Sequence, residues 1–537
     1  MMDTQLTLTE MIKHTEKYYS KKKVISRTHS GVHLFTYKET IRRMRQLSSA
    51  LESLGVGKGD KVGTFAWNHH RHLEAYFAVP CMGAVLHTIN IRLSEDDLTY
   101  IINHAGDKVL LIDVDLLPLI EKIKDRLTTV EAFVVMTDEA KLPDSAIERM
   151  HSYETLLANA DSNYSYSTDI DENDPAGICY TSGTTGKPKG VVYSHRGIYL
   201  HSMALGLKDT TSISENDVAM PVVPMFHANA WGMPFATTWF GSSQVLPGPN
   251  MTPKILAELI EEYRVTITAG VPTIWLGLLK ELENGSYDFS SIRSVLCGGS
   301  AAPKGMIQTF ETKYGVPFIH AYGMTETTPL ATLSRIKSYQ SDLTEEEMLE
   351  VRSKQGIAVP GIEVRIVNEN GEAKNDGEDM GELLIRGPWI ADSYYKDERS
   401  KDAFKDGWLH TGDVVTEDEE GTIKIVDRTK DLIKSGGEWI SSVDLENALM
   451  AHEAVFEAAV VAIPHPKWQE RPVACVVLKD SEKGKVTKED ILEYLRPQFA
   501  KWWLPDEVLF IEEVPKTSVG KFLKTALRDQ VKKQLAL

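Results

Sequence analysis

Apolar and polar positions alternate along the first part of the chain in a way that predicts helices and strands in turn. The stretch from Thr36 to Glu39 resembles a capping box, and residues 61–66 after the helix have the pattern of a strand. Between them, apolar residues keep the spacing of one helix face at Ile41, Met44, Leu47, Leu51 and Leu54.

The same order of elements returns further along the chain. The predicted elements there are a helix that starts at Thr252-Pro253, strands at 265–269 and 294–297, a helix at 303–314 and a strand at 318–320. Strands that alternate with helices imply buried parallel sheets, whose ligands bind beyond the carboxyl ends of the strands. The loops after Tyr180, Cys297 and His320 fall at such ends.

The last third of the chain has a different pattern. Short strands with turns at Asn370-Gly371 and Asp376-Gly377 predict a small antiparallel unit. A charged junction follows, and after it the pattern predicts a helix at 443–450, strands at 456–463 and 472–478, a helix at 488–498 and a strand at 507–511. The predicted fold class is α/β: a large N-terminal domain with parallel-rich sheets flanked by helices and a small antiparallel subdomain, followed by a small α+β C-terminal domain.

Composition excludes several classes of partner. The 537 residues are 42% hydrophobic and 25% charged, as in globular proteins, and the net charge of -18 argues against nucleic acid and against attachment to lipid through a basic patch. Without a signal peptide or a long apolar run, we expect a cytoplasmic protein with at most peripheral membrane contact. The cysteines are few and lack metal-ligand spacing, which indicates a reducing compartment: Cys81, Cys179, Cys297 and Cys475.

The stretch with the clearest chemistry is residues 180–190 (YTSGTTGKPKG), directly after a predicted strand. Its glycines, hydroxyls and lysines can cradle phosphate through backbone N–H groups and ammonium groups. It is not a Walker A loop, because two residues separate Gly183 from Gly186 and Pro188 follows Lys187. Considered alone, the stretch is also compatible with a flexible surface turn.

This loop resembles the signature of the adenylate-forming superfamily, which contains acyl-CoA synthetases, luciferases and peptide-synthetase adenylation domains. The remaining family motifs follow in the family's order at residues 322–326 (YGMTE), 408–413 (WLHTGD), 427–431 (DRTKD) and 515–521 (PKTSVGK). The resemblance covers nearly the whole chain. It implies a large domain at 1–427, a hinge at 428–433 and a mobile C-terminal domain at 434–537.

The resemblance implies two half-reactions: a carboxylate attacks the α-phosphate of ATP, and a thiol, usually coenzyme A, then takes the acyl group. By match, Thr184 and Glu326 hold Mg²⁺, and Lys521 reaches the carboxylate and the α-phosphate. The positions expected to bind ATP or AMP are Thr181, Ser182, Gly183, Thr184, Thr185, Gly186, Lys187, Gly299, Ser300, Ala301, His320, Ala321, Tyr322, Gly323, Thr325, Asp413, Arg428, Lys434, Trp439 and Lys521. Glu326 as a helix N-terminal acid and Lys521 as a solvated tail lysine are the structural alternatives.

The small domain is expected to rotate about Lys430, which matches the family's hinge position. In the rotated state Gly436, Gly437 and Glu438 would face coenzyme A. The sequence leaves open whether the protein forms a homodimer.

The uncharged, apolar stretch 224–234 resembles the acyl wall of medium- and long-chain fatty acid–CoA ligases, apart from His227. His227, Trp231, Gly298 and Gly323 are the expected acyl contacts, although a core histidine and a core tryptophan are the alternatives at His227 and Trp231. Three other functions stay open: a ligase for short or aromatic carboxylates, a loader of a carrier protein, and a non-catalytic acyl-binding protein.

Overall fold

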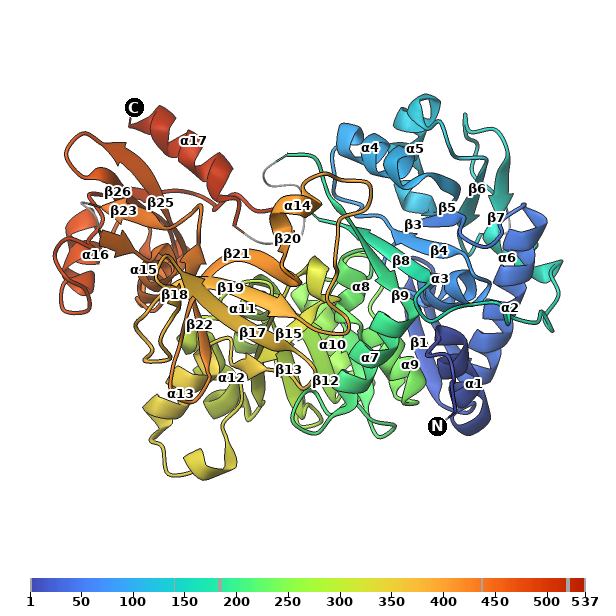
Figure 1. Cartoon of the computed structure of the whole chain (residues 1–537), viewed down its shortest axis with the longest axis horizontal. Coiled ribbons are helices and arrows are strands. Elements are labelled where there is room, and N and C mark those ends of the chain that lie inside the picture. The colour runs from blue at the N-terminus through green and yellow to red at the C-terminus, as the bar shows by residue number, and fades with distance from the viewer. Residues whose placement is uncertain (1, 140, 182–185, 436–437, 518–521, 536–537) are drawn as a thin grey trace.

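The computed structural model describes residues 2–139, 141–181, 186–435, 438–517 and 522–535. These residues form four sheets, two of them large and mostly parallel (Figure 1). Within the same residues, no helix combines the length and the apolar surface needed to cross a bilayer.

The first large sheet belongs to the N-terminal part of the chain. Its strands pair in parallel except for β8 and β9, which form an antiparallel pair around the phosphate-loop motif. The strand order is β7 (Met150–Ser152), β6 (Ala132–Met136), β5 (Asp107–Asp113), β3 (Lys61–Phe65), β4 (Val85–Thr88), β8 (Pro175–Tyr180) and β9 (Gly190–Ser194).

The second large sheet combines the first two strands of the chain with strands from its middle. It is parallel from β1 to β14 and antiparallel at both edges. The order is β16 (Ile357–Ala358), β15 (Leu330–Leu333), β14 (Phe318–Gly323), β13 (Ser294–Cys297), β12 (Ile267–Gly270), β10 (Val218–Pro221), β11 (Ser243–Leu246), β1 (Lys23–Thr28) and β2 (Gly31–Thr36).

Helices form three layers around these two sheets, because apolar faces on both sides of a parallel sheet must be covered. The central layer packs in one core with both sheets and contains α1 (Leu8–Tyr18), α2 (Tyr37–Ser53), α3 (His70–Cys81), α7 (His195–Gly206) and α9 (Met233–Trp239). One outer layer packs on the first sheet with α4 (Glu95–Ala105) and α5 (Leu117–Ile123). The other packs on the second sheet with α10 (Pro253–Glu262), α11 (Pro272–Asn284) and α12 (Lys304–Tyr314).

Two smaller sheets follow in the chain. The first is antiparallel and contains β17 (Glu363–Asn368), β18 (Gly371–Glu372), β19 (Gly381–Arg386), β20 (Phe404–Lys405), β21 (Trp408–Glu417) and β22 (Ile423–Arg428). The last contains β23 (Ile433–Ser435), β24 (Glu438–Ile440), β25 (Val455–His465), β26 (Gln469–Leu478) and β27 (Glu507–Phe510). Its two faces are covered by α15 (Ser442–Met450) and α16 (Lys488–Leu495) on one side and α17 (Lys524–Gln534) on the other.

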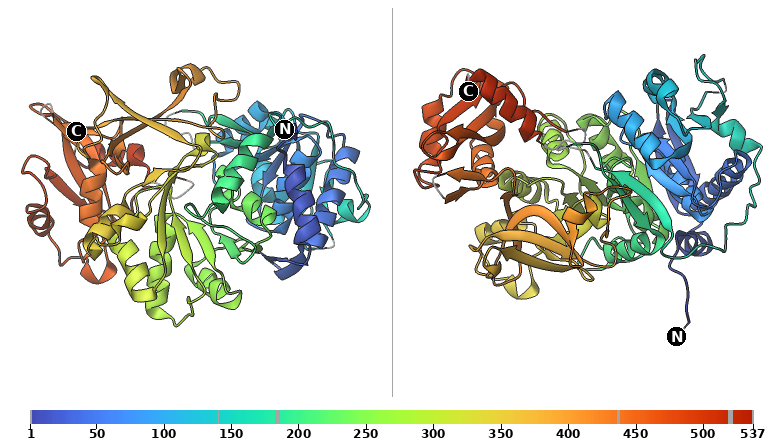
Figure 2. Two further views of the ribbon diagram at one scale, coloured as in Figure 1. Left: turned by 60° about the horizontal axis from the view of Figure 1, so that its bottom comes forward. Right: turned by 45° about the horizontal axis from the view of Figure 1, so that its top comes forward.

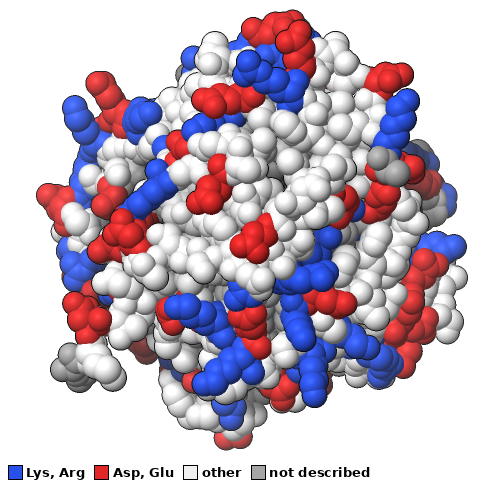
Figure 3. All heavy atoms as spheres, turned by 90° about the vertical axis from the view of Figure 1, so that its right-hand side faces the viewer, with Lys and Arg blue, Asp and Glu red and all other residues white. Residues whose placement is uncertain are grey.

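The different views agree that this C-terminal unit lies at the opposite end of the molecule from the first large sheet (Figures 1 and 2). Acidic and basic side chains are interspersed over the face that Figure 3 shows, despite the net charge of -18. The predicted fold class is confirmed, including the antiparallel unit and the small α+β region. The ends of the observed elements differ from the predicted ends by a few residues. The helix predicted at 488–498, for example, ends at Leu495.

Candidate active site

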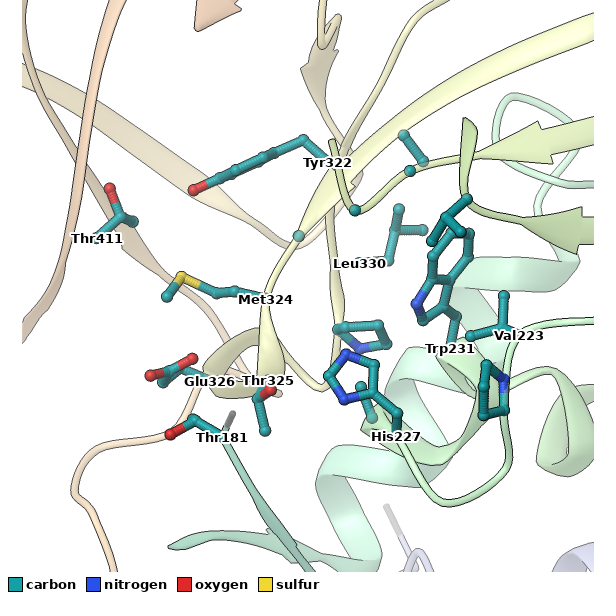
Figure 4. A pocket seen from close by; sticks show the side chains of 18 of the residues that line it. Thr181, Val223, His227, Trp231, Tyr322, Met324, Thr325, Glu326, Leu330 and Thr411 are labelled. Carbon is teal, nitrogen blue, oxygen red and sulfur yellow. The ribbon is translucent and has the colours of Figure 1, made fainter. Parts of the chain in front are cut away.

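The predicted ligand loops meet at one cavity of about 920 Å³, at the carboxyl ends of β8, β13 and β14. Parallel strands bring the carboxyl ends of β13 and β14 to one edge of the second large sheet, and the loop after β8 reaches the same cavity from the first large sheet. Figure 4 shows Tyr322, Glu326 and Thr181 on one side of it and Trp231 and Val223 on the other. The cavity therefore has a polar end and an apolar end.

One part of the polar end is built on Tyr322. Its hydroxyl donates to Asp413 Oδ2 at 2.6 Å, and Arg428 Nε lies 3.4 Å from Asp413 Oδ1. Asp413 and Arg428 are partners in register on β21 and β22, which fixes this pair. Burial and the neighbouring Asp413 raise the pKa of Tyr322, so its hydroxyl stays a donor at neutral pH.

Gly323 shapes the backbone behind that ring. A Cβ atom at Gly323 would lie 1.7 Å from the carbonyl oxygen of Pro329, so only glycine fits here. This close packing turns the chain from β14 into the short 3₁₀ turn Thr325–Thr327, which carries Glu326.

The other part of the polar end, next to the phosphate-loop motif, contains a buried carboxylate. Glu326 is 3% exposed, and its Oε1 accepts from the hydroxyl of Tyr394 at 2.7 Å. The same hydroxyl accepts from Lys189 Nζ at 2.9 Å. Arg399 donates to the backbone carbonyl of Lys187, within the phosphate-loop motif, at 3.1 Å. Cations and a carboxylate are the groups that a magnesium polyphosphate needs.

The apolar end begins at a turn with unusual backbone geometry. Residues 228–231 all have positive φ, between 43° and 58°, although none of them is glycine. Left-handed backbone costs such residues roughly 1–2 kcal/mol each, and strain of this kind clusters at binding sites. The turn is held by Asn229, whose Oδ1 contacts Cys179 Sγ at 3.3 Å and accepts from Thr88 Oγ1. It places both His227 and Trp231 at the cavity wall.

Beyond this turn the cavity is lined by aliphatic side chains. Trp231 stands against Gly298, where an added Cβ would lie 3.2 Å from the indole ring. The aliphatic lining consists of Leu205, Val222, Val223, Met233, Met251, Val271, Ile274, Leu296 and Leu330. This end of the cavity can hold an alkyl chain by burial of apolar surface.

The structure brings most of the predicted site residues together. Those that line the cavity are Thr181, Gly186, Lys187, His227, Trp231, Gly298, Gly299, Ala321, Tyr322, Gly323, Thr325, Glu326, Arg428 and Lys430. His320 lies buried beside them and contacts the carbonyls of Ser353 and Ser300, while Ala301 follows Ser300 in the same loop. Lys434 and Trp439 are outside the lining and contact each other, with Lys434 Nζ 5.2 Å from the indole centroid.

Several predicted residues fall outside the described part of the chain: Ser182, Gly183, Thr184, Thr185, Gly436, Gly437 and Lys521. Lys189, Tyr394 and Arg399 also line the polar end and were not predicted as site residues. Lys189 belongs to the loop motif and could have been found there. Tyr394 and Arg399 lie between β19 and β20 of the antiparallel sheet, in a stretch with no phosphate-binding pattern of its own.

Matches to family models identify the class of protein to which this fold and cavity belong. A family model described as "AMP-binding enzyme" matches residues 13–395, and one described as "AMP-binding enzyme C-terminal domain" matches residues 444–521. The chain belongs to the AMP-binding enzyme family. The predicted membership of the adenylate-forming superfamily is therefore confirmed.

Curated relatives match over nearly their whole length. A long-chain-fatty-acid–CoA ligase of Thermus thermophilus is 51% identical, with 99% of this chain and 97% of the relative covered. A medium-chain-fatty-acid–CoA ligase of Ectopseudomonas oleovorans is 42% identical over the same shares of both chains. Among solved structures, the anthranilate CoA ligase AuaEII in complex with anthranoyl-AMP is similar with a TM-score of 0.89 and 25% identity, covering 100% of this chain and 99% of that one.

Proposed function

We propose that the protein is an ATP-dependent, AMP-forming ligase that converts a medium- to long-chain fatty acid and coenzyme A to acyl-CoA, AMP and pyrophosphate. The observation that carries this proposal is the single cavity that joins a nucleoside end, a phosphate end and an aliphatic end. The names of the long-chain and medium-chain relatives support the same substrate class.

In the first half-reaction the fatty acid carboxylate attacks the α-phosphorus of ATP. A carboxylate–phosphorus bond forms, the bond to the bridging oxygen of pyrophosphate breaks, and no proton has to move. Because two anions meet, the site needs positive charge more than a base. Lys187 and Lys189 supply it from the phosphate loop, and Lys521 is proposed to reach the reacting carboxylate and the α-phosphate.

The donor set at the phosphate end fits Mg²⁺. Glu326 presents a buried carboxylate, and in Figure 4 it lies next to the hydroxyl of Thr181. Hard oxygen ligands of this kind suit magnesium, which binds a few protein oxygens together with substrate phosphates. We propose that Glu326 and Thr184 hold the ion, which when bound neutralises charge on the phosphate oxygens.

The nucleoside is proposed to lie between the ring of Tyr322 and the loop of Gly299, Ser300 and Ala301. A flat aromatic face suits the adenine ring, and the buried Asp413 carboxylate can accept from both ribose hydroxyls. Arg428 holds a positive charge beside that carboxylate, with its Nε 3.4 Å from Asp413 Oδ1.

In the second half-reaction the thiol of coenzyme A attacks the acyl carbonyl and AMP leaves. We propose that residues 434–537 rotate for this step about Lys430, with residues 428–433 as linker and 1–427 as the fixed domain. Arg528 of α17 contacts Asp431 and the carbonyl of Lys430, so the linker is held from the small domain in this orientation. After rotation, Gly436, Gly437 and Glu438 would face the thiol.

The substrate class is tested by an assay of AMP release with coenzyme A and fatty acids of increasing length. We expect kcat/KM to rise from short acids to medium and long ones, because each added methylene buries apolar surface worth roughly 0.8 kcal/mol. A 3-methylmercaptopropionyl-CoA ligase of Ruegeria lacuscaerulensis is 42% identical as well, which favours a short acid as the second candidate. A preference for short or aromatic acids would replace the proposed substrate.

Lys521→Ala is the matched negative control for this assay, since it should release little AMP with any acid. Release of AMP without coenzyme A, and transfer only to an added carrier protein, would instead indicate a carrier loader.

The location and the assembly state stay predictions. The buried, unpaired thiols of Cys81, Cys179, Cys297 and Cys475 support a reducing compartment such as the cytoplasm. A homodimer is to be tested by sedimentation.

A further inference from the structure

A short segment ties together the two phosphate-binding motifs of the site. We call residues 389–395 the strap. Near its middle the N–H of Ala391 donates to the carbonyl of Glu326 at 2.8 Å, and at its end the N–H of Tyr395 donates to the carbonyl of Gly190 at 2.8 Å. The strap therefore fixes its side chains relative to both Glu326 and the phosphate loop.

Further bonds make the strap rigid next to Glu326. The indole N–H of Trp389 donates to the carbonyl of Leu330 at 2.9 Å, and the hydroxyl of Thr328 donates to the carbonyl of Trp389. A side chain that rises from the strap into the site is consequently held in one place.

Tyr394 is that side chain. It is 5% exposed, its ring packs edge-on against Phe404, and its N–H is bonded to Ser400 Oγ at 2.9 Å. Its hydroxyl accepts from Lys189 at 2.9 Å and donates to Glu326 at 2.7 Å. All three of these groups line the cavity.

This arrangement solves an electrostatic problem. An ammonium and a carboxylate in a poorly hydrated site attract each other strongly and tend to pair directly. A direct ion pair between Lys189 and Glu326 would use the ammonium charge that the phosphates of ATP need. It would also use the carboxylate oxygen that a metal ion needs. A hydroxyl between them, acceptor on one side and donor on the other, leaves two N–H groups of the ammonium and one oxygen of the carboxylate available.

We infer that Tyr394 is a positioning residue: its hydroxyl keeps Lys189 and Glu326 apart and presents both to the polyphosphate of ATP. The inference rests on the proposed metal-ligand role of Glu326. The residue acts through its two neighbours and takes no part in bond making.

The test compares the binding of ATP and AMP to Tyr394→Phe by calorimetry, without fatty acid, over a range of Mg²⁺ concentrations. We expect ATP to bind about tenfold more weakly and to need more Mg²⁺, since the variant loses two charge-assisted hydrogen bonds. AMP carries no β- or γ-phosphate, so its affinity should change by less than about twofold on the same scale. Tyr395→Phe removes a hydroxyl from the next residue of the strap and is the matched control.

A double-mutant cycle separates the proposed role from simple loss of packing. In a Lys189→Met background no ammonium is left to pair with Glu326, so adding Tyr394→Phe should weaken ATP binding far less than it does in the wild type. Equal effects in both backgrounds, equal weakening of ATP and AMP, or unchanged ATP binding would each overturn the inference. If the ATP affinity of the wild type does not depend on the Mg²⁺ concentration, the metal role of Glu326 is refuted. The double-mutant cycle at a fixed Mg²⁺ concentration would still decide whether Tyr394 separates the two charges.

Discussion

At the scale of single residues, the polar end of the site contains buried polar groups that contact one another. Asp413 is the clearest case, because it is 6% exposed and is contacted by both Tyr322 and Arg428. A buried carboxylate with a donor and a cation next to it is well prepared to accept further donors from a ribose.

Asp413→Asn is therefore expected to weaken AMP binding about tenfold, since hydrogen bonds to a charged group contribute roughly 1.5–3 kcal/mol. Calorimetry with AMP and with 2′,3′-dideoxy-AMP checks the reason for the loss. The dideoxy nucleotide should bind the variant and the wild type alike, and a matching loss for both ligands would place Asp413 elsewhere than at the ribose. The exposed Asp342→Asn is the control.

Most of these residues could be predicted from sequence, and the reason is local. Tyr322, Gly323 and Glu326 lie within five consecutive positions, so a single motif predicts that they line the same cavity. The hydrogen bonds of the Tyr394 hydroxyl to Lys189 and Glu326 could not be predicted, because these three residues come together only when three distant segments fold. Partners separated by 68 and 205 positions leave no periodic signal in the chain.

At the scale of elements, sequence patterns predicted the helices and strands where local physics decides them. The capping box at the start of α2 is present: Thr36 Oγ1 accepts from the N–H of Glu39 at 3.3 Å, and Glu39 Oε2 accepts from the N–H of Thr36 at 2.7 Å. The turn at 228–231 had no such signal, because alanine and tryptophan do not favour positive φ. Its shape is imposed by packing and by Asn229.

The capping box gives a direct test of one element. Thr36→Ala should lower the free energy of unfolding by about 1 kcal/mol, the usual cost of a lost N-cap. Urea unfolding measures the total effect, and faster amide exchange at residues 37–39 would assign it to the first turn of α2. Thr36→Ser keeps the acceptor oxygen and should restore most of the loss. If the serine variant is as unstable as the alanine variant, packing of the threonine methyl rather than capping is responsible.

At the scale of the whole molecule, several histidines are buried where they cannot easily be charged. Burial lowers the pKa of His201 from 6.5 to about 3, that of His72 to about 3 and that of His195 to about 4. The unfolded chain then binds more protons than the folded chain between about pH 3 and 6.5. The contribution of these histidines to the free energy of unfolding is therefore complete above about pH 6.5 and is lost as the pH drops through that window.

His201 allows one contribution to be isolated. Its ring is 1% exposed and accepts from the N–H of Leu330 at 3.3 Å. At pH 5 its lowered pKa should cost the wild type about 2 kcal/mol relative to pH 7. His201→Gln keeps an acceptor but cannot be charged, so urea unfolding at both pH values should show a smaller pH effect by about that amount. The exposed His14→Gln is the control, and an equal pH effect in the wild type and His201→Gln would refute the assignment.

At the same scale, residues 428–433 are the proposed linker about which the C-terminal residues rotate between the two half-reactions. In this orientation the N–H of Thr429 donates to the carbonyl of Gly412 at 3.0 Å, and α17 holds the linker through Arg528. If rotation about residue 430 is needed for thioester formation, Lys430→Pro should restrict it, because proline fixes φ near roughly −65° and removes an N–H. The variant should form acyl-AMP and pyrophosphate at a near-normal rate and release little acyl-CoA.

Local unfolding is the competing explanation for such a loss, and the half-reactions distinguish the two. Unfolding would impair both steps and lower the melting temperature, whereas a blocked rotation impairs only the second step. Pyrophosphate release and transfer from supplied acyl-AMP to coenzyme A should therefore be measured separately, together with thermal melting. Lys430→Ala removes the same side chain without fixing φ and should keep both steps, which separates the backbone from the ammonium group. If Lys430→Pro turns over normally with coenzyme A, the linker does not pivot at this residue, and the division of the chain at 428–433 must be abandoned.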